Sequence, residues 1–136
     1  MRHYLLDSGP VAAYLQGRRS VVELVTPWII HREVATSILV YAEVTEYIKS
    51  LSDYSRRHND LRRLLSEVYP YFLTYSILER YADVRRLLRP PQGTGLIGDI
   101  DTLIAATALE RNLTIVTADA DYKRVPGLQI ELISLK

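Results

Sequence analysis

The stretch GDIDTLIAATALERNLTIVT, residues 98–117, predicts a helix that is followed directly by a buried strand. Its apolar side chains recur every three to four residues, so we expect a helix over Asp99–Arg111 that stops near Asn112. The next five residues, Leu113–Thr117, form an apolar run with the composition of a strand. A helix that leads into a buried strand is typical of proteins in which helices cover a parallel sheet.

The same alternation of strands and helices continues outward over the rest of the chain. Strands are expected at His3–Asp7, Glu33–Ser37, Leu113–Thr117 and Leu128–Ile133, with a brief extended piece at Leu73–Ser76. Helices are expected at Pro10–Leu15, Val21–Ile30, Ile38–Leu51, Arg56–Phe72, Ile77–Leu88 and Asp99–Arg111. This alternation predicts an α/β sandwich with a central, mainly parallel sheet, and it leaves the order of the strands open.

Length and composition indicate one globular domain over residues 1–136. Hydrophobic residues make up 48% and charged residues 24%, the ordinary balance of a soluble protein. The absence of cysteine excludes a disulfide framework, thiolate catalysis and cysteine-bound zinc or iron–sulfur sites. No apolar run is long enough to span a bilayer and no signal-peptide layout is present, so we expect a cytoplasmic protein without membrane contact.

Four carboxylates are expected to meet at one edge of the predicted sheet, where ligands of open α/β sheets bind. Asp7 ends the first strand, and Asp119 lies two residues beyond the strand Leu113–Thr117. The helices return antiparallel to the strands, so their N-termini lie at the same edge. This brings in Asp101 from the first turn of one helix and Glu43 from the second turn of another.

Each acid also has a local explanation. Asp7 is placed to cap the helix that begins at Pro10, and Asp119 is placed to start an Asx turn. Asp99 is expected to be the N-cap of its helix, and the helix dipole favours Asp101 in the first turn. The cluster is harder to explain locally, because carboxylates within about 4–6 Å of one another disfavour ionisation without a cation.

An oxygen-only ligand set favours Mg²⁺ or Mn²⁺ over zinc or copper, and the three histidines are too scattered along the chain to form an imidazole site. We expect Asp7 and Asp101 to be the main ligands, while the other two carboxylates bind directly, bind through water or orient the attacking water. Ser8 and Thr117 are candidates to donate hydrogen bonds to the ligands. Such a site without a nucleophilic side chain beside it predicts phosphodiester hydrolysis with one or two ions.

Four segments of the chain resemble, in order and spacing, the signature segments of PIN domains. They are YLLDSGPV (residues 4–11), SILVYAEV (37–44), DIDTLIAATAL (99–109) and IVTADADYKRVPGL (115–128). The resemblance covers almost the whole chain, and the short length and the final VPGL are most similar to VapC-type toxins of toxin–antitoxin pairs.

The resemblance implies a PIN-like α/β/α sandwich and a Mg²⁺- or Mn²⁺-dependent endoribonuclease. It also implies a homodimer that a cognate VapB-like antitoxin neutralises. The positions that match the family's acidic metal-binding residues are Asp7, Glu43, Asp101 and Asp119. Ser37 matches a position that carries a small hydroxyl residue, and Thr117 one that carries Thr or Ser.

The chain departs from the family pattern at a few positions. Gly9 stands where many relatives have Asn, which puts in doubt one polar contact near the metal but not a ligand. Val40 replaces a frequent Thr, and Tyr122 replaces the usual Phe, which is expected to be a mild change. Asp99 is an additional acid, and we expect it to have a peripheral role at the site.

Arginines and tyrosines gather in the middle of the chain. If the substrate is RNA, the approach to the acids is lined either by Arg85, Arg86 and Arg89 or by Arg56 and Arg57. The tyrosines at positions 69, 71, 75 and 81 are expected to be packing residues or part of a subunit interface rather than platforms for bases.

Other functions fit the sequence less well or stay open beside the toxin. A phosphatase of the haloacid-dehalogenase kind needs a second Asp at position 9, which is glycine here. A receiver domain needs adjacent acids before its phosphorylated Asp, and the segment HYLLD has none. A housekeeping PIN nuclease of RNA processing and a non-catalytic PIN scaffold that binds RNA or protein remain alternatives. Scaffolds typically lack one or more of the acids, whereas this chain has a candidate at all four positions.

Overall fold

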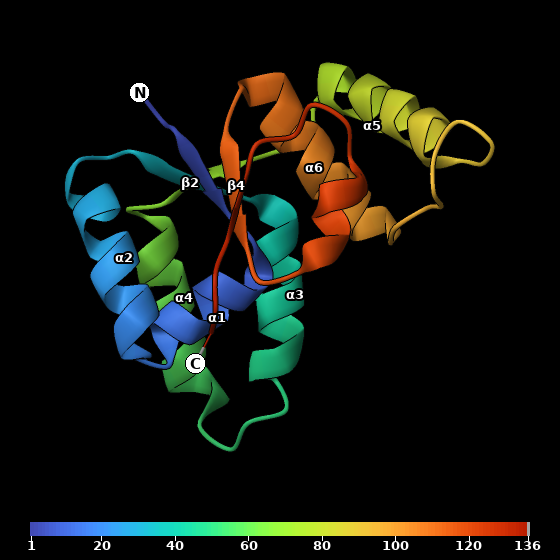
Figure 1. The fold of residues 1–136 in the computed structure, drawn as a ribbon. Coiled ribbons are helices and arrows are strands. Elements are labelled where there is room, and N and C mark those ends of the chain that lie inside the picture. Colours follow the sequence, from blue (N-terminus) through green and yellow to red (C-terminus); the bar gives the residue numbers. More distant parts are fainter. Residues whose placement is uncertain (136) are drawn as a thin grey trace.

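Five short parallel strands form the central sheet of the computed structural model, which describes residues 1–135 (Figure 1). The strands are β1 (Tyr4–Leu6), β2 (Val34–Ser37), β3 (Tyr69–Tyr71), β4 (Thr114–Thr117) and β5 (Ile130–Leu132). Their order in the sheet is β3-β2-β1-β4-β5, and every neighbouring pair is parallel. The strand β1 is therefore central, with Leu5 opposite both Ala35 and Ile115.

Six helices and one short 3₁₀ helix connect the strands. They are α1 (Ser8–Leu15), α2 (Arg19–Ile30), α3 (Ile38–Ile48), α4 (Tyr54–Leu65), α5 (Tyr75–Leu88), α6 (Asp99–Arg111) and the 3₁₀ helix η1 (Ala120–Arg124). The helix α1 packs on α2, α3 and α4, while α5 packs on α6. In Figure 1 the helices α2 and α4 lie on one side of the strands and α5 and α6 on the other. This arrangement confirms the predicted α/β sandwich.

The strand sequence explains why the sheet is covered on both faces. Leu5 and Leu6 in β1 and Ile115 and Val116 in β4 are all fully buried, although neighbouring side chains of a strand point to opposite faces. Such strands need apolar cover on each face, which the two groups of helices supply. The carboxyl ends of the central strands therefore lie together at one edge of the sheet, with helices on both faces.

One predicted helix is wrong at its C-terminal end. The helix α4 stops at Leu65, and residues 69–71 of the predicted helix Arg56–Phe72 form the strand β3. Pro70 lies in this segment and lacks the N–H that a helix interior requires, but an edge strand tolerates proline.

The extended piece predicted at Leu73–Ser76 is also only half correct. The helix α5 already begins at Tyr75, because Thr74 is its N-cap and its side chain accepts a hydrogen bond from the backbone N–H of Ile77. Other boundaries differ by two or three residues: α1 begins at Ser8, α2 begins at Arg19 and α3 ends at Ile48. Over residues 1–135 no helix has both the length and the apolar character needed to cross a membrane.

Candidate active site

The central strand β1 delivers the most buried acid of the chain to the carboxyl edge of the sheet. Asp7 follows β1 directly and is only 7% exposed. It occupies the N-cap position of α1, but its side chain makes no capping hydrogen bond to that helix. Its carboxylate instead accepts hydrogen bonds from two side chains, Thr117 and Tyr122. The local explanation of Asp7 as a helix cap is therefore insufficient.

The segment after β4 holds the Asp7 carboxylate from both sides. The Thr117 hydroxyl donates to Asp7 Oδ2 at 2.8 Å, and the Tyr122 hydroxyl lies 3.3 Å from Asp7 Oδ1. Thr117 Oγ1 is itself fixed, because it accepts a hydrogen bond from the backbone N–H of Asp119 at 3.0 Å. Thr117, at the end of β4, is thus a donor to the predicted ligand, in agreement with the sequence analysis.

Asp101 joins this arrangement from the first turn of α6. The hydroxyl of Tyr122 lies 3.2 Å from Asp101 Oδ1, so one phenol stands between the carboxylates of Asp7 and Asp101. Burial, followed by the two neighbouring carboxylates, raises the pKa of Tyr122 and keeps its hydroxyl protonated as a donor. The two acids come from segments that are far apart in the chain, as the topology predicts.

Glu43 lies beside these acids on α3. It is half-buried, and its Oε1 is a buried oxygen without a hydrogen-bond partner. Burial raises the pKa of Glu43, the nearby Ser8 hydroxyl offsets part of this rise, and the charges of Asp7 and Asp101 add to it. An unpartnered buried carboxylate oxygen is costly, and a bound water, an ion or a catalytic role accounts for such atoms in native proteins.

Asp119 has a local role as well as a place at this edge. Its Oδ1 accepts a hydrogen bond from the backbone N–H of Asp121 at 2.9 Å, so it caps η1 in the way that an Asx turn predicts. Its charge nevertheless acts on Asp7 and Asp101, whose pKa values it raises. The structure thus shows the local role of Asp119, and its role as a metal ligand stays a prediction.

The electrostatics of this acid cluster, which comprises Asp7, Glu43, Asp101 and Asp119, favour a cation. Burial raises the pKa of Asp7, Glu43 and Asp101, and in each case a neighbouring carboxylate raises it further. None of the ion pairs found over residues 1–135 includes a member of the cluster. Within the described residues, several carboxylates therefore lie together without a basic side chain to neutralise them.

The donor chemistry of the cluster fits a hard divalent cation, although the ligands are not fully gathered. Within residues 1–135, no three His, Cys, Asp or Glu side chains are arranged closely enough to hold a metal ion. Asp7 and Asp101 are linked through Tyr122, and Glu43 supplies an oxygen that has no other partner. Oxygen donors of this kind suit Mg²⁺ or Mn²⁺.

Asp99 lies outside the acid cluster, and its predicted capping role is wrong. The N-cap of α6 is Gly98, and the Asp99 carboxylate accepts hydrogen bonds from the side chains of Tyr81 at 3.1 Å and Arg85 at 2.7 Å. Because both partners lie on α5, Asp99 fastens α6 to α5. Ser37 is fully buried and caps α3 by accepting from the backbone N–H of Leu39. Neither side chain contacts the acids in these hydrogen bonds.

The sequence analysis missed the importance of Tyr122. Its ring is fully buried, and its hydroxyl contacts two of the predicted ligands. The substitution of Tyr for the usual Phe was therefore a usable signal, because a hydroxyl added to a buried ring must find a partner. The histidines are not at the site: His58 pairs with Tyr41, and His3 and His31 are exposed.

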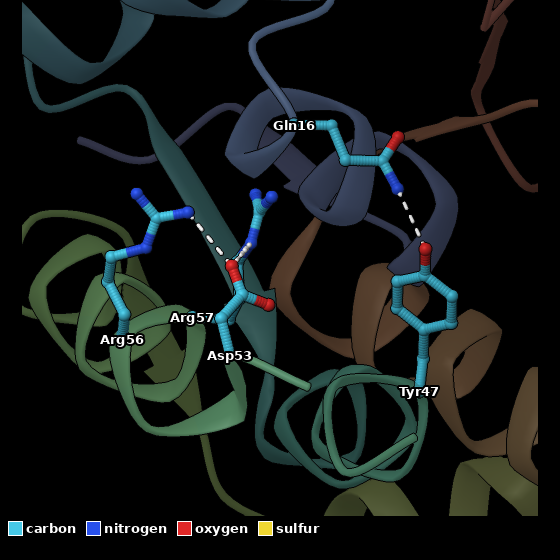
Figure 2. A network of polar contacts seen from close by, with 5 residues as sticks. All are labelled: Gln16, Tyr47, Asp53, Arg56 and Arg57. Carbon is cyan, nitrogen blue, oxygen red and sulfur yellow. Dashed lines mark hydrogen bonds and ion pairs between the residues drawn. The ribbon is translucent and has the colours of Figure 1, made fainter. Parts of the chain in front are cut away.

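The two groups of candidate arginines differ in their partners. Figure 2 shows Arg56 and Arg57, both of which bind the Asp53 carboxylate, beside the hydrogen bond from Gln16 to Tyr47. On α5, Arg85 pairs with Asp99 at the start of α6. Arg86 and Arg89 form no ion pair within residues 1–135, and both line a concavity at the C-terminal end of α5.

The tyrosines in the middle of the chain also differ from one another. Tyr71 packs against the hydrophobic core, as predicted, and Tyr81 is partly buried with its hydroxyl bonded to Asp99. Tyr69 is 48% exposed and Tyr75 is 85% exposed, so Tyr75 is not a packing residue within this chain.

Comparison with known proteins identifies the family. The model of the PIN domain matches residues 4–128. The chain belongs to the PIN domain family. No curated protein matches the chain in sequence.

Solved PIN-type structures share the fold over nearly the full length of the chain. A chain of VapBC2 from Rickettsia felis, bound to a DNA fragment from its promoter, has 23% sequence identity and a TM-score of 0.84 over 96% of this chain and 98% of that chain. A chain of DNA-bound VapBC from Salmonella typhimurium has 19% identity and a TM-score of 0.84 with the same coverage. A chain of FitAcB from Neisseria gonorrhoeae has 21% identity and a TM-score of 0.76 over 93% of this chain and 95% of that chain. At these identities the comparison establishes the fold.

Proposed function

We propose that this PIN domain is a Mg²⁺- or Mn²⁺-dependent endoribonuclease and the toxin of a VapBC-type toxin–antitoxin pair. The observation that carries the proposal is the acid cluster: the pKa values of Asp7, Glu43 and Asp101 are raised, and no member of the cluster has a basic partner in residues 1–135. Membership of the PIN family and the shared fold with chains of VapBC complexes support the toxin assignment. We further propose that residues 1–136 form one domain that acts as a cytoplasmic homodimer and is neutralised by a VapB-like antitoxin.

In this proposal Asp7 and Asp101 hold the ion, and Glu43 and Asp119 complete the ligand set directly or through water. The bound ion supplies charge that lowers the pKa of the attacking water and stabilises the leaving oxygen of the phosphodiester. Thr117 keeps the Asp7 carboxylate in a fixed orientation through its 2.8 Å hydrogen bond. Glu43 Oε1, which has no hydrogen-bond partner within residues 1–135, would orient the attacking water and accept its proton.

The RNA backbone needs a cationic approach to this acidic edge. Of the candidate arginines, Arg86 and Arg89 are free to bind phosphates, because Arg56, Arg57 and Arg85 are already paired with aspartates. The concavity that Arg86 and Arg89 line lies at the C-terminal end of α5, and Arg85 in the same turn contacts the start of α6. We therefore assign phosphate contacts to Arg86 and Arg89 rather than to Arg56 and Arg57.

The proposal is tested by incubating purified protein, free of antitoxin, with total RNA from its host in the presence of Mg²⁺, Mn²⁺ or EDTA. Discrete products that appear only with metal would support the nuclease. If a folded protein that binds Mn²⁺ cleaves no RNA, the nuclease assignment is contradicted and the scaffold alternative gains support. Induced expression in a bacterial host tests the toxin, which should arrest growth unless a VapB-like partner is co-expressed.

A further inference from the structure

Tyr122 occupies an unusual place among the polar residues of the site. Its ring is fully buried, yet its hydroxyl lies 3.3 Å from Asp7 Oδ1 and 3.2 Å from Asp101 Oδ1. A hydroxyl that donates to a single carboxylate oxygen lies at about 2.5–2.7 Å from it. The two longer and nearly equal distances are those of one proton shared between two acceptors. Tyr122 therefore contacts both acids at once rather than pairing with either alone.

The backbone around Tyr122 fixes the phenol in this position. Asp119 caps η1, and its own N–H is bonded to Thr117 at the end of β4. The same short segment thereby presents two hydroxyl donors, Thr117 to one oxygen of Asp7 and Tyr122 to the other. Because Asp7 follows β1 and Asp101 belongs to α6, the Tyr122 hydroxyl connects these two elements at the site.

We propose that the Tyr122 hydroxyl is a positioning clamp that holds the Asp7 and Asp101 carboxylates at the separation required for one divalent cation. This inference rests on the proposed function, since it takes these two acids as the main ligands. Two carboxylates that face each other without a cation repel, and their side chains separate unless a donor lies between them. The clamp reduces the rearrangement that accompanies metal binding. Partners of this kind around metal ligands commonly change metal affinity by about ten- to one-hundred-fold.

The substitution Tyr122→Phe tests the clamp, because it removes one oxygen and keeps the buried ring. Tyr41→Phe is the matched control: the Tyr41 hydroxyl bonds to His58 Nε2 at 2.9 Å, on a face of α3 that packs against α4. Each variant therefore loses one phenol hydroxyl that is hydrogen-bonded inside the protein, Tyr122 to two acids and Tyr41 to one histidine. Circular dichroism and thermal unfolding in EDTA establish that both variants are folded before metal is added.

The readout is the affinity for Mn²⁺ alone, measured without RNA by the electron paramagnetic resonance signal of the free ion. We expect Tyr122→Phe to weaken Mn²⁺ binding about tenfold or more, while Tyr41→Phe binds as the wild type does. Equal affinity of Tyr122→Phe and the wild type would overturn the clamp and leave the metal site standing. Tighter binding by Tyr122→Phe would also overturn it, because the hydroxyl would then compete with the ion. A folded wild-type protein that binds no Mn²⁺ would overturn both the clamp and the proposed function.

Discussion

Asp53 and the acid cluster present the same chemical group in two opposite settings. Asp53 lies directly before α4, is partly exposed and binds two arginines, which lower the pKa of its carboxyl (Figure 2). Asp7, Glu43 and Asp101 are partly or fully buried and have no basic partner within residues 1–135, and the pKa of each is raised. Asp53 is thus neutralised by its neighbours, whereas the charges of the three buried acids are not balanced by any residue of the described range.

The contrast separates carboxylates that stabilise the fold from carboxylates placed at a cost to stability. Asp53 anchors the first turn of α4 through Arg56 and Arg57, which lie three and four residues later. The acid cluster instead gathers charge from four segments at one edge of the sheet, where a bound cation would recover the cost. Groups with perturbed pKa values that converge in this way are characteristic of functional sites.

The largest expected effect is on catalysis. Asp101→Asn keeps the shape of the side chain but removes a charged ligand, so we expect RNA cleavage to fall by at least about a hundredfold. The measurement is the initial rate of cleavage of a labelled RNA in Mn²⁺. Asp53→Asn is the matched control from the exposed setting and should cleave at the wild-type rate. Similar losses in the two variants would remove the distinction between the two settings.

Metal binding should stabilise the fold through the acid cluster. At a concentration one hundred times the dissociation constant, Mn²⁺ should raise the free energy of unfolding of the wild type by about 2.7 kcal/mol. Thermal unfolding with and without EDTA measures this gain. The gain should vanish in Asp7→Asn and persist in Asp53→Asn. A gain that persists in Asp7→Asn would place the ion elsewhere.

The arginines provide a smaller test of the same contrast. We expect the double variant Arg86→Ala with Arg89→Ala to bind a non-cleavable RNA about tenfold more weakly, because two phosphate contacts are lost. The slope of the logarithm of the affinity against the logarithm of the salt concentration should become shallower by about 0.7 per arginine. Arg56→Ala with Arg57→Ala removes the same charge, but these arginines are held by Asp53 and should have little effect. Fluorescence anisotropy at several salt concentrations measures both quantities. Equal effects would contradict the assignment.

The smallest expected effect is the pH dependence of the metal-free protein. The pKa values of Asp7, Glu43 and Asp101 are raised in the folded chain. Between the ordinary and the raised pKa values, the folded chain therefore binds more protons than the unfolded chain. The free energy of unfolding consequently falls as the pH rises from about 4 through the raised pKa values. Asp7→Asn should remove part of this fall and gain about 1 kcal/mol at neutral pH, which is roughly 3–5 °C in Tm.

Asp53 provides the opposite sign in the same experiment. Because its pKa is lowered, its contribution is present above pH 3.8 and is lost as pH falls through the lowered value. Asp53→Asn should therefore show no gain at neutral pH. The variants are compared by thermal unfolding in EDTA between about pH 4.5 and 8. This interval spans roughly the ordinary and the raised pKa values of carboxyl groups. A loss of stability in Asp7→Asn at neutral pH would contradict the account of the cluster.

Sequence periodicity predicted most of the fold because the buried strands and amphipathic helices carry strong patterns. It failed at β3, where Pro70 and two tyrosines follow a helix without a clear break in pattern, and where pairing with β2 decides the conformation. Parallel topology predicts that the four acids lie at one edge of the sheet, and neighbouring carboxylates raise the pKa values of Asp7, Glu43 and Asp101. Sequence alone did not predict that Gly98 rather than Asp99 caps α6, because the partners of Asp99 lie on another helix.

The role of Tyr122 shows a further limit of sequence reasoning. Tyr122 departs from the family pattern, which the sequence shows. The contacts of its hydroxyl with Asp7 and Asp101 depend on the relative placement of β1, α6 and η1. Distances between side chains from three segments do not follow from spacing along the chain. The ion pairs that distinguish Arg56 from Arg86 depend in the same way on which side chains are neighbours in space.

The most direct test of the central claim is a crystal structure of the protein grown with Mn²⁺, with data collected at the manganese absorption edge. The account predicts an anomalous peak between the carboxylates of Asp7 and Asp101, with Glu43 turned towards it. No peak at this position in a crystal saturated with Mn²⁺, or a peak beside Asp53 instead, would contradict the account.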